Sequence, residues 1–336
     1  MRDQRNYSLL RHNTFGIDAI CQRFVEVESV DELQAFAATV TEADRRLLII
    51  GGGSNLLLTG NYPGTVLHVA IKGITPDVAN PSLLRVGCGE VWDDVVEYCV
   101  AHYLYGAENL SLIPGEVGAT AVQNIGAYGA EVKDIIYKVE AVEVVTGRRV
   151  TFGRDECGYG YRQSRFKQEW AGHYIITHVT YQLSTTFTPH LDYGNIRAEL
   201  QRQGIDHPTA RQLRDTIIHI RREKLPDPAE QGNAGSFFMN PVVTKEQFRK
   251  LQHDYPQIPH YAAGDDHEKI PAAWLIDQCG WKGRTLGAAG VYQKQPLVLV
   301  NCGGATGADV VALCRAIQYD VEQRFGIAIK PEVNIV

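Results

Sequence analysis

Two glycine-rich segments hold the residues of this sequence that could bind a cofactor. The first, residues 51–55 (GGGSN), follows the apolar run at residues 47–50, where a turn lets backbone N–H groups approach an anion closely. It is not a dinucleotide-binding fingerprint, because Leu56 stands where G-x-G-x-x-G needs its third glycine. A glycine turn between two strands explains the segment equally well, so alone it predicts little.

The second segment, residues 113–129, reads IPGEVGATAVQNIGAYG and is denser in small residues. Gly and Ala at this frequency, with Gln123, Asn124 and Tyr128 among them, suit a flat ligand that lies on the backbone and takes a few amide hydrogen bonds. An irregular structural loop is the alternative interpretation. Two such segments in a chain without a Rossmann fingerprint favour a cofactor that carries both phosphate and an aromatic ring system.

The elements that must position these segments alternate between strand and helix in the first third of the chain. Short β-type runs at residues 23–27 and 47–50 flank a helix that begins with a capping box, Ser29 with Glu32. This order is that of a β-α-β unit. Further predicted elements are strands at 65–69 and 83–88, a helix at 91–100, an irregular loop at 108–129, a hairpin of strands 139–145 and 149–152 joined at Thr146-Gly147, and a strand at 174–183.

A change of domain is predicted near residue 225. The helix around residues 213–221 must stop at Leu225-Pro226-Asp227-Pro228, because two prolines in three residues cannot continue a helix. Beyond it we expect a helix at 244–251 with a Thr244/Gln247 capping box, a helix at 272–279 ended by Gly280, a strand at 297–301, a helix at 309–325 and a strand-like end at 327–336. In the last helix six apolar residues share one stripe, which predicts packing on a sheet: Val310, Leu313, Cys314, Ile317, Val321 and Phe325.

Composition and charge exclude several classes of protein. The chain has 336 residues, 44% of them hydrophobic, and a formal net charge of −6, which predicts a globular protein of two or three domains and argues against a nucleic-acid binder. No apolar run is long enough for a signal-peptide core or a membrane span. The seven cysteines form no C-x-x-C pair, and the histidines show no metal-ligand spacing. We therefore expect a cytoplasmic protein with no metal, nucleic acid or membrane partner. We also expect a monomer or weak oligomer, an expectation that does not derive from composition or charge.

Many short motifs, taken in order, resemble the UDP-N-acetylenolpyruvoylglucosamine reductase family. Besides the two glycine-rich segments they are Asn13-Thr14-Phe15-Gly16, Gly160-Tyr161-Arg162, Lys224-Leu225-Pro226-Asp227-Pro228, Gly232-Asn233-Ala234-Gly235-Ser236-Phe237-Phe238, Trp274-Leu275-Ile276-Asp277 and Pro331-Glu332-Val333. The resemblance extends over nearly the whole chain, and the number of separate motifs makes it specific. The loop at residues 191–195 (LDYGN) is similar to that of the longer type in this family, in which the Tyr folds over bound substrate.

The resemblance implies an α+β fold. An FAD-binding domain of the vanillyl-alcohol-oxidase/PCMH type, in two α+β subdomains, is followed by a C-terminal α+β substrate domain. The resemblance implies three parts. Residues 1–72 with 327–336 are expected to form the N-terminal FAD-binding subdomain, residues 73–224 the second FAD-binding subdomain, and residues 225–326 the substrate-binding domain.

The resemblance also implies FAD as the cofactor and NADPH as the hydride donor. FAD binding is noncovalent, because the first segment offers no His or Cys, through which some members of the wider superfamily attach flavin. Glu116, Ala119-Thr120 and Met239 depart from the family's pattern, which bears on the exact pyrophosphate contacts. The FAD-binding residues map onto Gly51, Gly52, Gly53, Ser54, Asn55, Pro114, Gly115, Gly118, Ala119, Gln123, Asn124, Gly126, Ala127 and Tyr128.

By the same resemblance the reaction is the reduction of the enolpyruvyl ether of UDP-N-acetylglucosamine-enolpyruvate to UDP-N-acetylmuramate, for bacterial peptidoglycan. Hydride goes from reduced flavin to C3 and leaves negative charge that spreads from C2 into the carboxylate, so the site needs positive charge there and a proton donor at C2. The family's pattern assigns the carboxylate to Arg162 and Glu332 and the proton to Ser236. Its UDP-sugar contacts map onto Tyr193, Lys224, Asn240, Lys282 and Gln295.

Each of these residues has an ordinary structural explanation when taken alone, and only their occurrence together favours catalysis. Two other functions therefore stay open. A flavin oxidase or dehydrogenase acting on a sugar or alcohol would have a reduced flavin that reacts quickly with oxygen. A non-catalytic UDP-sugar or flavin-binding module would be colourless, or yellow but not bleached by NADPH.

Overall fold

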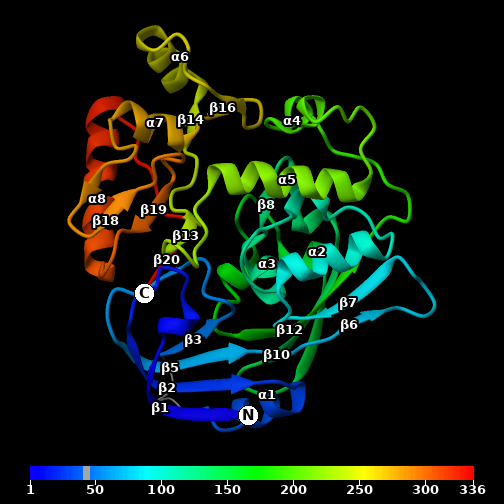
Figure 1. The fold of residues 1–336 in the computed structure, drawn as a ribbon. Helices are drawn as coiled ribbons and strands as arrows, with labels where there is room; N and C mark the ends of the chain where they lie inside the picture. The colour runs from blue at the N-terminus through cyan, green and yellow to red at the C-terminus, as the bar shows by residue number, and fades with distance from the viewer. Residues whose placement is uncertain (41–45) are drawn as a thin grey trace. The chain divides into compact units, whose positions relative to one another are not determined.

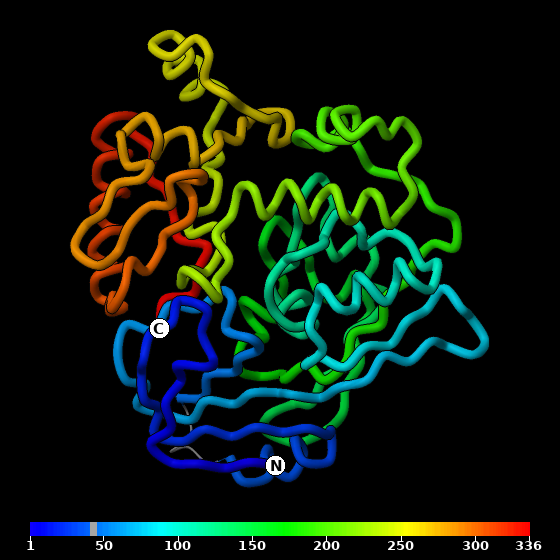
Figure 2. Tube along the Cα trace, viewed as in Figure 1, coloured from blue at the N-terminus to red at the C-terminus, as the bar shows by residue number. Residues whose placement is uncertain are grey.

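The computed structural model describes residues 1–40 and 46–336, and the chain forms two compact units. Unit 1 comprises Met1–Tyr7, Ile20–Gly52 and Tyr62–Glu223, and unit 2 comprises Ser8–Ala19, Gly53–Asn61 and Lys224–Val336. Figure 1 labels most of the elements of both units, and Figure 2 follows the path of the chain through them. Because each unit combines stretches that are distant in sequence, long-range contacts hold each one together.

The first sheet of unit 1 contains the predicted β-α-β unit. Its strand order is β1 (Arg2–Ser8), β2 (Ile20–Val27), β5 (Tyr62–Val69), β3 (Leu47–Ile50). Both β2 and β3 run parallel to β5, which lies between them. Helix α1 (Val30–Ala37) connects β2 to β3 and begins as predicted, because the Ser29 hydroxyl accepts a hydrogen bond from the Glu32 N–H at 3.2 Å.

The second sheet of unit 1 is antiparallel and has the order β11 (Arg149–Gly153), β10 (Ile136–Glu143), β12 (Tyr174–Gln182), β7 (Leu83–Gly87), β6 (Ile74–Pro76). The predicted hairpin is its β10–β11 pair. Seven of the nine residues of the central strand β12 are buried. Helix α2 (Trp92–Ala101) covers this core, and the Trp92 ring meets the Tyr181 ring edge-on at 5.6 Å between centroids.

The prediction of an irregular loop at residues 108–129 was wrong. This stretch contains a 3₁₀ turn (Glu108–Leu110), helix α3 (Val117–Gln123) and strand β8 (Gly126–Ala127), which pairs with β9 (Ala130–Glu131). Small residues hid the helix, because they show no apolar stripe, yet they are what lets α3 lie close to its neighbours. A Cβ on Gly118 would lie only 3.0 Å from the Cys88 Cβ.

Two helices complete unit 1 beside these sheets. Helix α4 (Ile196–Arg202) and helix α5 (Ala210–Lys224) share a small apolar cluster of Ile196, Leu200, Leu213 and Ile217. As expected, α5 ends immediately before Leu225-Pro226. The two units divide at the same place, between Glu223 and Lys224.

Unit 2 contains an antiparallel sheet with the order β13 (Asn233–Ser236), β19 (Val298–Asn301), β18 (Ala289–Val291), β17 (Thr285–Leu286). Helix α8 (Gly307–Phe325) contacts this sheet with its predicted stripe, all six residues of which are buried. A smaller sheet has the order β14 (Val242–Thr244), β16 (His267–Lys269), β15 (Tyr261–Ala262). Helices α6 (Lys245–Asp254) and α7 (Ala272–Gln278) complete the unit near their predicted places.

The C-terminal stretch differs from its predicted form. Only Asn334–Ile335 forms a strand, β20, which pairs in parallel with β4 (Leu56–Leu57). This pairing places residues 327–336 in unit 2, whereas the division implied by the resemblance put them with residues 1–72. In the described part of the chain, no helix combines the length and the apolar character that crossing a bilayer requires.

Candidate active site

Arg162 lies against the backbone of the second glycine-rich segment. Its guanidinium donates through Nη2 to the Gly126 carbonyl at 2.7 Å and through Nη1 to the Asn124 carbonyl at 3.5 Å. A Cβ at position 126 would lie 2.8 Å from Nη1 and 3.0 Å from the Ala130 carbonyl oxygen, so a larger residue there would displace the guanidinium. Arg162 itself has φ +56°, a left-handed conformation that costs a non-glycine residue free energy. The surrounding structure therefore holds this cation in one place.

Asn124 holds the turn that carries Arg162. Its Nδ2 donates to the Gly160 carbonyl at 2.8 Å and to Glu131 Oε2 at 3.0 Å, while its Oδ1 accepts from the Lys133 N–H at 3.1 Å. These bonds engage both ends of a fully buried amide. We interpret Asn124 as a residue that positions Gly160-Tyr161-Arg162; its predicted contact with the cofactor stays a prediction.

The first glycine turn contributes to both units. In unit 1, a Cβ on Gly51 would lie 3.1 Å from Glu116 Oε2, and one on Gly52 would lie 3.7 Å from the Gly115 Cα. The structure thus brings the two glycine-rich segments together there. In unit 2, Gly53 has φ +64°, and a Cβ on it would lie 2.0 Å from the His12 carbonyl oxygen. The glycine at position 53 is therefore required by the fold itself.

Ser236 and Glu332 are brought together in unit 2 by backbone pairing. The Glu332 N–H donates to the Phe237 carbonyl at 2.8 Å, and the Met239 N–H donates to the Lys330 carbonyl at 2.9 Å. The Asn55 amide also donates to the Glu332 carbonyl, at 3.3 Å, which ties the end of the first glycine turn to this place. Ser236 is exposed at the end of β13, and Glu332 is half-buried.

The predicted substrate residues lie in both units. Tyr193 belongs to unit 1, in the loop before α4, where its Cβ is 3.3 Å from the position of a Cβ on Gly129. The Asn109 side chain steadies the surroundings by donating to the Tyr128 and His190 carbonyls. Lys224, Asn240, Lys282 and Gln295 belong to unit 2.

Two of these side chains in unit 2 bond to the backbone. Asn240 Oδ1 accepts from the Ala272 N–H at 2.9 Å, at the start of α7, and Gln295 Oε1 accepts from the Leu297 N–H at 3.4 Å. Lys224 and Lys282 are exposed. The two amides are thus held in place by the fold, whereas the two ammonium groups face solvent.

Sequence reasoning missed Arg221. This half-buried residue lies near the end of α5, close enough to Tyr128 for the two groups to affect each other's pKa. Burial lowers the pKa of Arg221, and within the described residues its Nε is buried without a hydrogen-bond partner. A buried guanidinium with an open N–H is suited to an anionic ligand. The only sequence signal was its spacing, one helical turn before Lys224.

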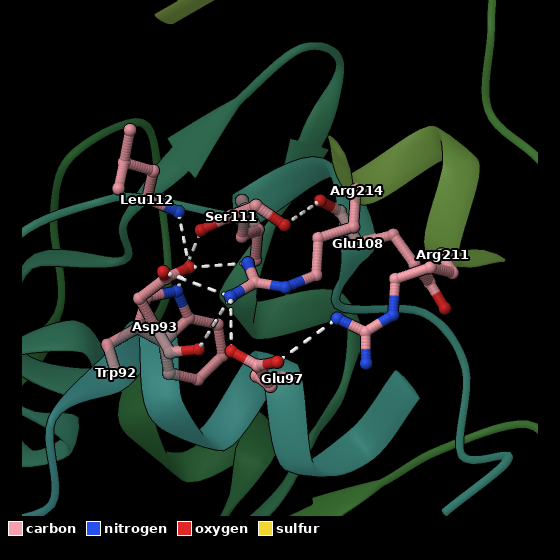
Figure 3. Close-up of polar contacts among 9 residues, drawn as sticks. Trp92, Asp93, Glu97, Glu108, Ser111, Leu112, Arg211 and Arg214 are labelled. Atoms are coloured by element: carbon pink, nitrogen blue, oxygen red, sulfur yellow. Dashed lines mark hydrogen bonds and ion pairs between the residues drawn. The ribbon is translucent and has the colours of Figure 1, made fainter. Parts of the chain in front are cut away.

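A buried ion pair holds α5 against α2 and against the chain just before the second segment (Figure 3). The Arg214 side chain is 4% exposed and donates to both carboxylate oxygens of Asp93, at 2.7 and 3.1 Å. Asp93 also accepts from the Leu112 N–H, and Leu112 has φ +56°. Glu97 joins at the rim, 3.4 Å from Arg214 and 3.1 Å from Arg211. The Asp93 carboxylate of α2 therefore holds α5 in place through Arg214 and also fixes the backbone at Leu112, just before the second glycine-rich segment.

Two protein-family models match the chain: the UDP-N-acetylenolpyruvoylglucosamine reductase C-terminal domain over residues 227–336, and the FAD binding domain over residues 21–153. The UDP-N-acetylenolpyruvoylglucosamine reductase of Bacteroides fragilis strain YCH46 is 53% identical over 336 residues, which cover 99% of this chain and 100% of the relative. That of Porphyromonas gingivalis strain W83 is 47% identical over 335 residues, 99% of each chain. The crystal structure of the Thermus caldophilus UDP-N-acetylenolpyruvylglucosamine reductase matches with a TM-score of 0.69 at 25% identity and covers 100% of this chain and 99% of its own.

Replacing Asp93 by Ala is expected to destabilise the protein strongly. The buried Arg214 guanidinium would lose its main partner and keep only the exposed Glu97 carboxylate at 3.4 Å, and breaking a buried pair in this way typically costs about 3–5 kcal/mol of the free energy of unfolding. Asp93→Asn keeps one acceptor and should lose less. Glu97→Ala is the matched control on the same helix; because Glu97 is 56% exposed, its loss should cost below about 1 kcal/mol. Urea unfolding measures all three, and equal losses for Asp93→Ala and Glu97→Ala would contradict the assignment.

Gly53→Ala is expected to lower the thermal unfolding temperature more than Gly16→Ala. Both glycines have nearly the same φ, +64° and +66°, so both variants incur the left-handed cost of about 1–2 kcal/mol. Position 53 adds the contact with His12, whereas no atom of residues 1–40 or 46–336 lies within 4 Å of a Cβ on Gly16. Differential scanning calorimetry of the two variants checks this, and a smaller effect at position 53 would show that the turn relaxes freely.

Proposed function

Because this chain belongs to the UDP-N-acetylenolpyruvoylglucosamine reductase family, we propose that it uses FAD and NADPH to reduce UDP-N-acetylglucosamine-enolpyruvate to UDP-N-acetylmuramate, a precursor of peptidoglycan. The relatives at 53% and 47% identity match it over nearly its full length. The structural observation that carries the proposal is the placement of Arg162, a cation suited to the substrate carboxylate, on the backbone of the segment expected to bind the flavin.

The residues present fit FAD. The diphosphate of FAD is an anion, and Arg221 offers a buried guanidinium with an open Nε beside Tyr128 of the second segment. Gly51 and Gly52 leave backbone without side chains at the first turn, where a phosphate group can approach closely. When bound, FAD supplies the hydride. We propose that the residues named above in the two glycine-rich segments, 51–55 and 114–128, hold FAD without a covalent bond.

Arg162 is proposed to stabilise the negative charge that develops on the substrate. Reduction at C3 leaves charge on C2 and on the carboxylate, and fixed positive charge at such a place is usually the largest catalytic contribution. The planar guanidinium matches the carboxylate geometry, and its bonds to the Gly126 and Asn124 carbonyls hold it in place before substrate arrives. Glu332 can help to hold the carboxylate only through a proton or a water molecule, because two bare carboxylates repel each other.

Ser236 is proposed to deliver the proton to C2. Its hydroxyl stands at the exposed end of β13, and the pairing of Phe237 with Glu332 places it close to the second carboxylate-binding candidate. A serine hydroxyl passes a proton on and does not store one, so a relay must replenish it. Tyr193, Lys224, Asn240, Lys282 and Gln295 are proposed to bind the UDP-sugar.

A visible spectrum of the purified protein tests the function as a whole. The protein should be yellow, NADPH should bleach it without oxygen, and the enolpyruvyl sugar should then restore the colour. A colourless protein, or one that NADPH does not bleach, would favour a binding module. Rapid reoxidation by oxygen with no response to the enolpyruvyl sugar would favour an oxidase.

Ser236→Ala is expected to separate the two halves of the cycle. NADPH should bleach the flavin at a near-normal rate, because that step needs no proton at this position. Reoxidation by the enolpyruvyl sugar should slow by roughly 10²–10⁴-fold, the usual contribution of a positioned general acid. Stopped-flow absorbance follows each half separately.

Ser236→Cys is the matched control for this experiment. A thiol can also donate a proton, so this variant should recover part of the reoxidation rate. If Ser236→Ala slowed flavin reduction and reoxidation equally, the Ser236 hydroxyl would serve to position the chain at the end of β13, and another residue would have to donate the proton.

A further inference from the structure

His68 lies between two carboxylates in unit 1. Its Nδ1 is 2.8 Å from Glu26 Oε2, and its Nε2 is 3.1 and 3.2 Å from the two carboxylate oxygens of Glu116. Glu26 stands opposite His68 in the β2–β5 register, whereas Glu116 comes from the second glycine-rich segment. The His68 side chain is 12% exposed and that of Glu116 is 14% exposed, so water screens this contact only partly.

This geometry favours the doubly protonated imidazolium. A neutral imidazole has one N–H, so it would leave one carboxylate facing a lone pair, whereas the imidazolium donates to both. Burial lowers the pKa of His68, but the hydrogen bonds and charges of Glu116 and Glu26 together outweigh burial and leave the pKa above its ordinary value. On the other side of His68 in the sheet, its neighbour is Ile50 of β3, which brings no charge.

Glu116 connects the group formed by Glu26, His68 and Glu116 to the two glycine-rich segments. Its Oε2 lies 3.1 Å from the position of a Cβ on Gly51, directly against the first turn. Glu116 occupies the N-cap position of α3, yet its side chain makes no capping hydrogen bond and is directed to His68 instead. A bare carboxylate here would repel the diphosphate of FAD, and it is also one of the positions where this chain departs from the family's pattern.

We propose that His68 is a positioning residue for FAD: its imidazolium holds Glu116 in place and offsets the charge that Glu116 brings to the two glycine-rich segments. The proposal rests on the proposed function, since it concerns the binding of the same cofactor. FAD affinity should be highest while His68 carries its second proton. It should fall as the pH rises through the raised pKa of His68, because the group then changes from one net negative charge to two.

The test measures the Kd of FAD for the full-length apoprotein, by flavin fluorescence, between pH 6 and 8.5. Wild type should bind more weakly at the upper end of this range. His68→Gln should raise the Kd roughly tenfold or more at pH 6, the size of one charge-assisted hydrogen bond, and should flatten the pH profile. Glu116→Gln removes the charge that needs offsetting, so it should keep most of the affinity at pH 6 and show a smaller fall toward pH 8.5 than wild type, because only Glu26 still faces His68.

The double variant His68→Gln/Glu116→Gln separates charge compensation from packing. It should bind FAD more tightly than His68→Gln alone, because the unpaired carboxylate is gone. A double variant as weak as His68→Gln, or a His68→Gln variant with the wild-type pH profile, would overturn the proposal. If His68→Gln fails to fold, Glu116→Gln alone decides, since a fall in affinity between pH 6 and 8.5 as large as that of wild type would contradict the proposed offset of the Glu116 charge by His68.

Wild-type binding distinguishes this inference from the proposed function. A wild-type protein that binds no FAD at any pH would overturn the proposed function and the inference with it. A wild-type protein that binds FAD and turns over the enolpyruvyl sugar, with a pH profile that His68→Gln leaves unchanged, would overturn only the inference.

Discussion

The candidate site in unit 1 depends on chain segments that approach one another closely and on glycines that leave space between them. A Cβ on Gly51 would crowd the Glu116 carboxylate, and Gly52 lies against the Gly115 backbone. Gly118 lets α3 lie on Cys88, and Gly126 makes room for the Arg162 guanidinium. An interface without side chains contributes little apolar burial of its own, so its geometry must be held by groups around it.

Two carboxylates help to hold this geometry near the start of the second glycine-rich segment. Asp93 bonds the Leu112 N–H and the buried Arg214, while Glu116 bonds His68. Both are partly buried interactions, in which a missing partner costs more than a well-made pair contributes. Such contacts favour one arrangement over others, which matters where chain segments approach as closely as these do.

Unit 2 positions its candidate residues by a different device, the pairing of the chain's last residues with the stretch just after β13 and with β4. The Glu332 N–H and the Phe237 carbonyl set the distance between two proposed catalytic residues, and β20 anchors the end of the chain on β4. Because backbone hydrogen bonds define this register, the side chains at positions 236 and 332 can be chosen for chemistry and need not serve the fold.

The sequence by itself determined the elements whose signals are local. The Ser29 and Thr244 caps, the stripe of α8 and the proline stop after α5 depend on residues a few positions apart, and all appear as predicted. Its ordered motifs also identified the family and the candidate reactive residues. Helix α3 was missed because small residues carry no apolar period, and the extent of β20 was overestimated because an apolar run does not show what it pairs with.

Only the tertiary structure decided the partners of residues that are distant in sequence. Nothing local to Glu26, His68 or Glu116 shows that they meet, and nothing local to Arg221 shows that its Nε is buried with no hydrogen-bond partner among the described residues. The physical reason is that local propensity depends on neighbours in the chain, whereas burial, charge pairing and the space left by a missing Cβ depend on which surfaces pack together.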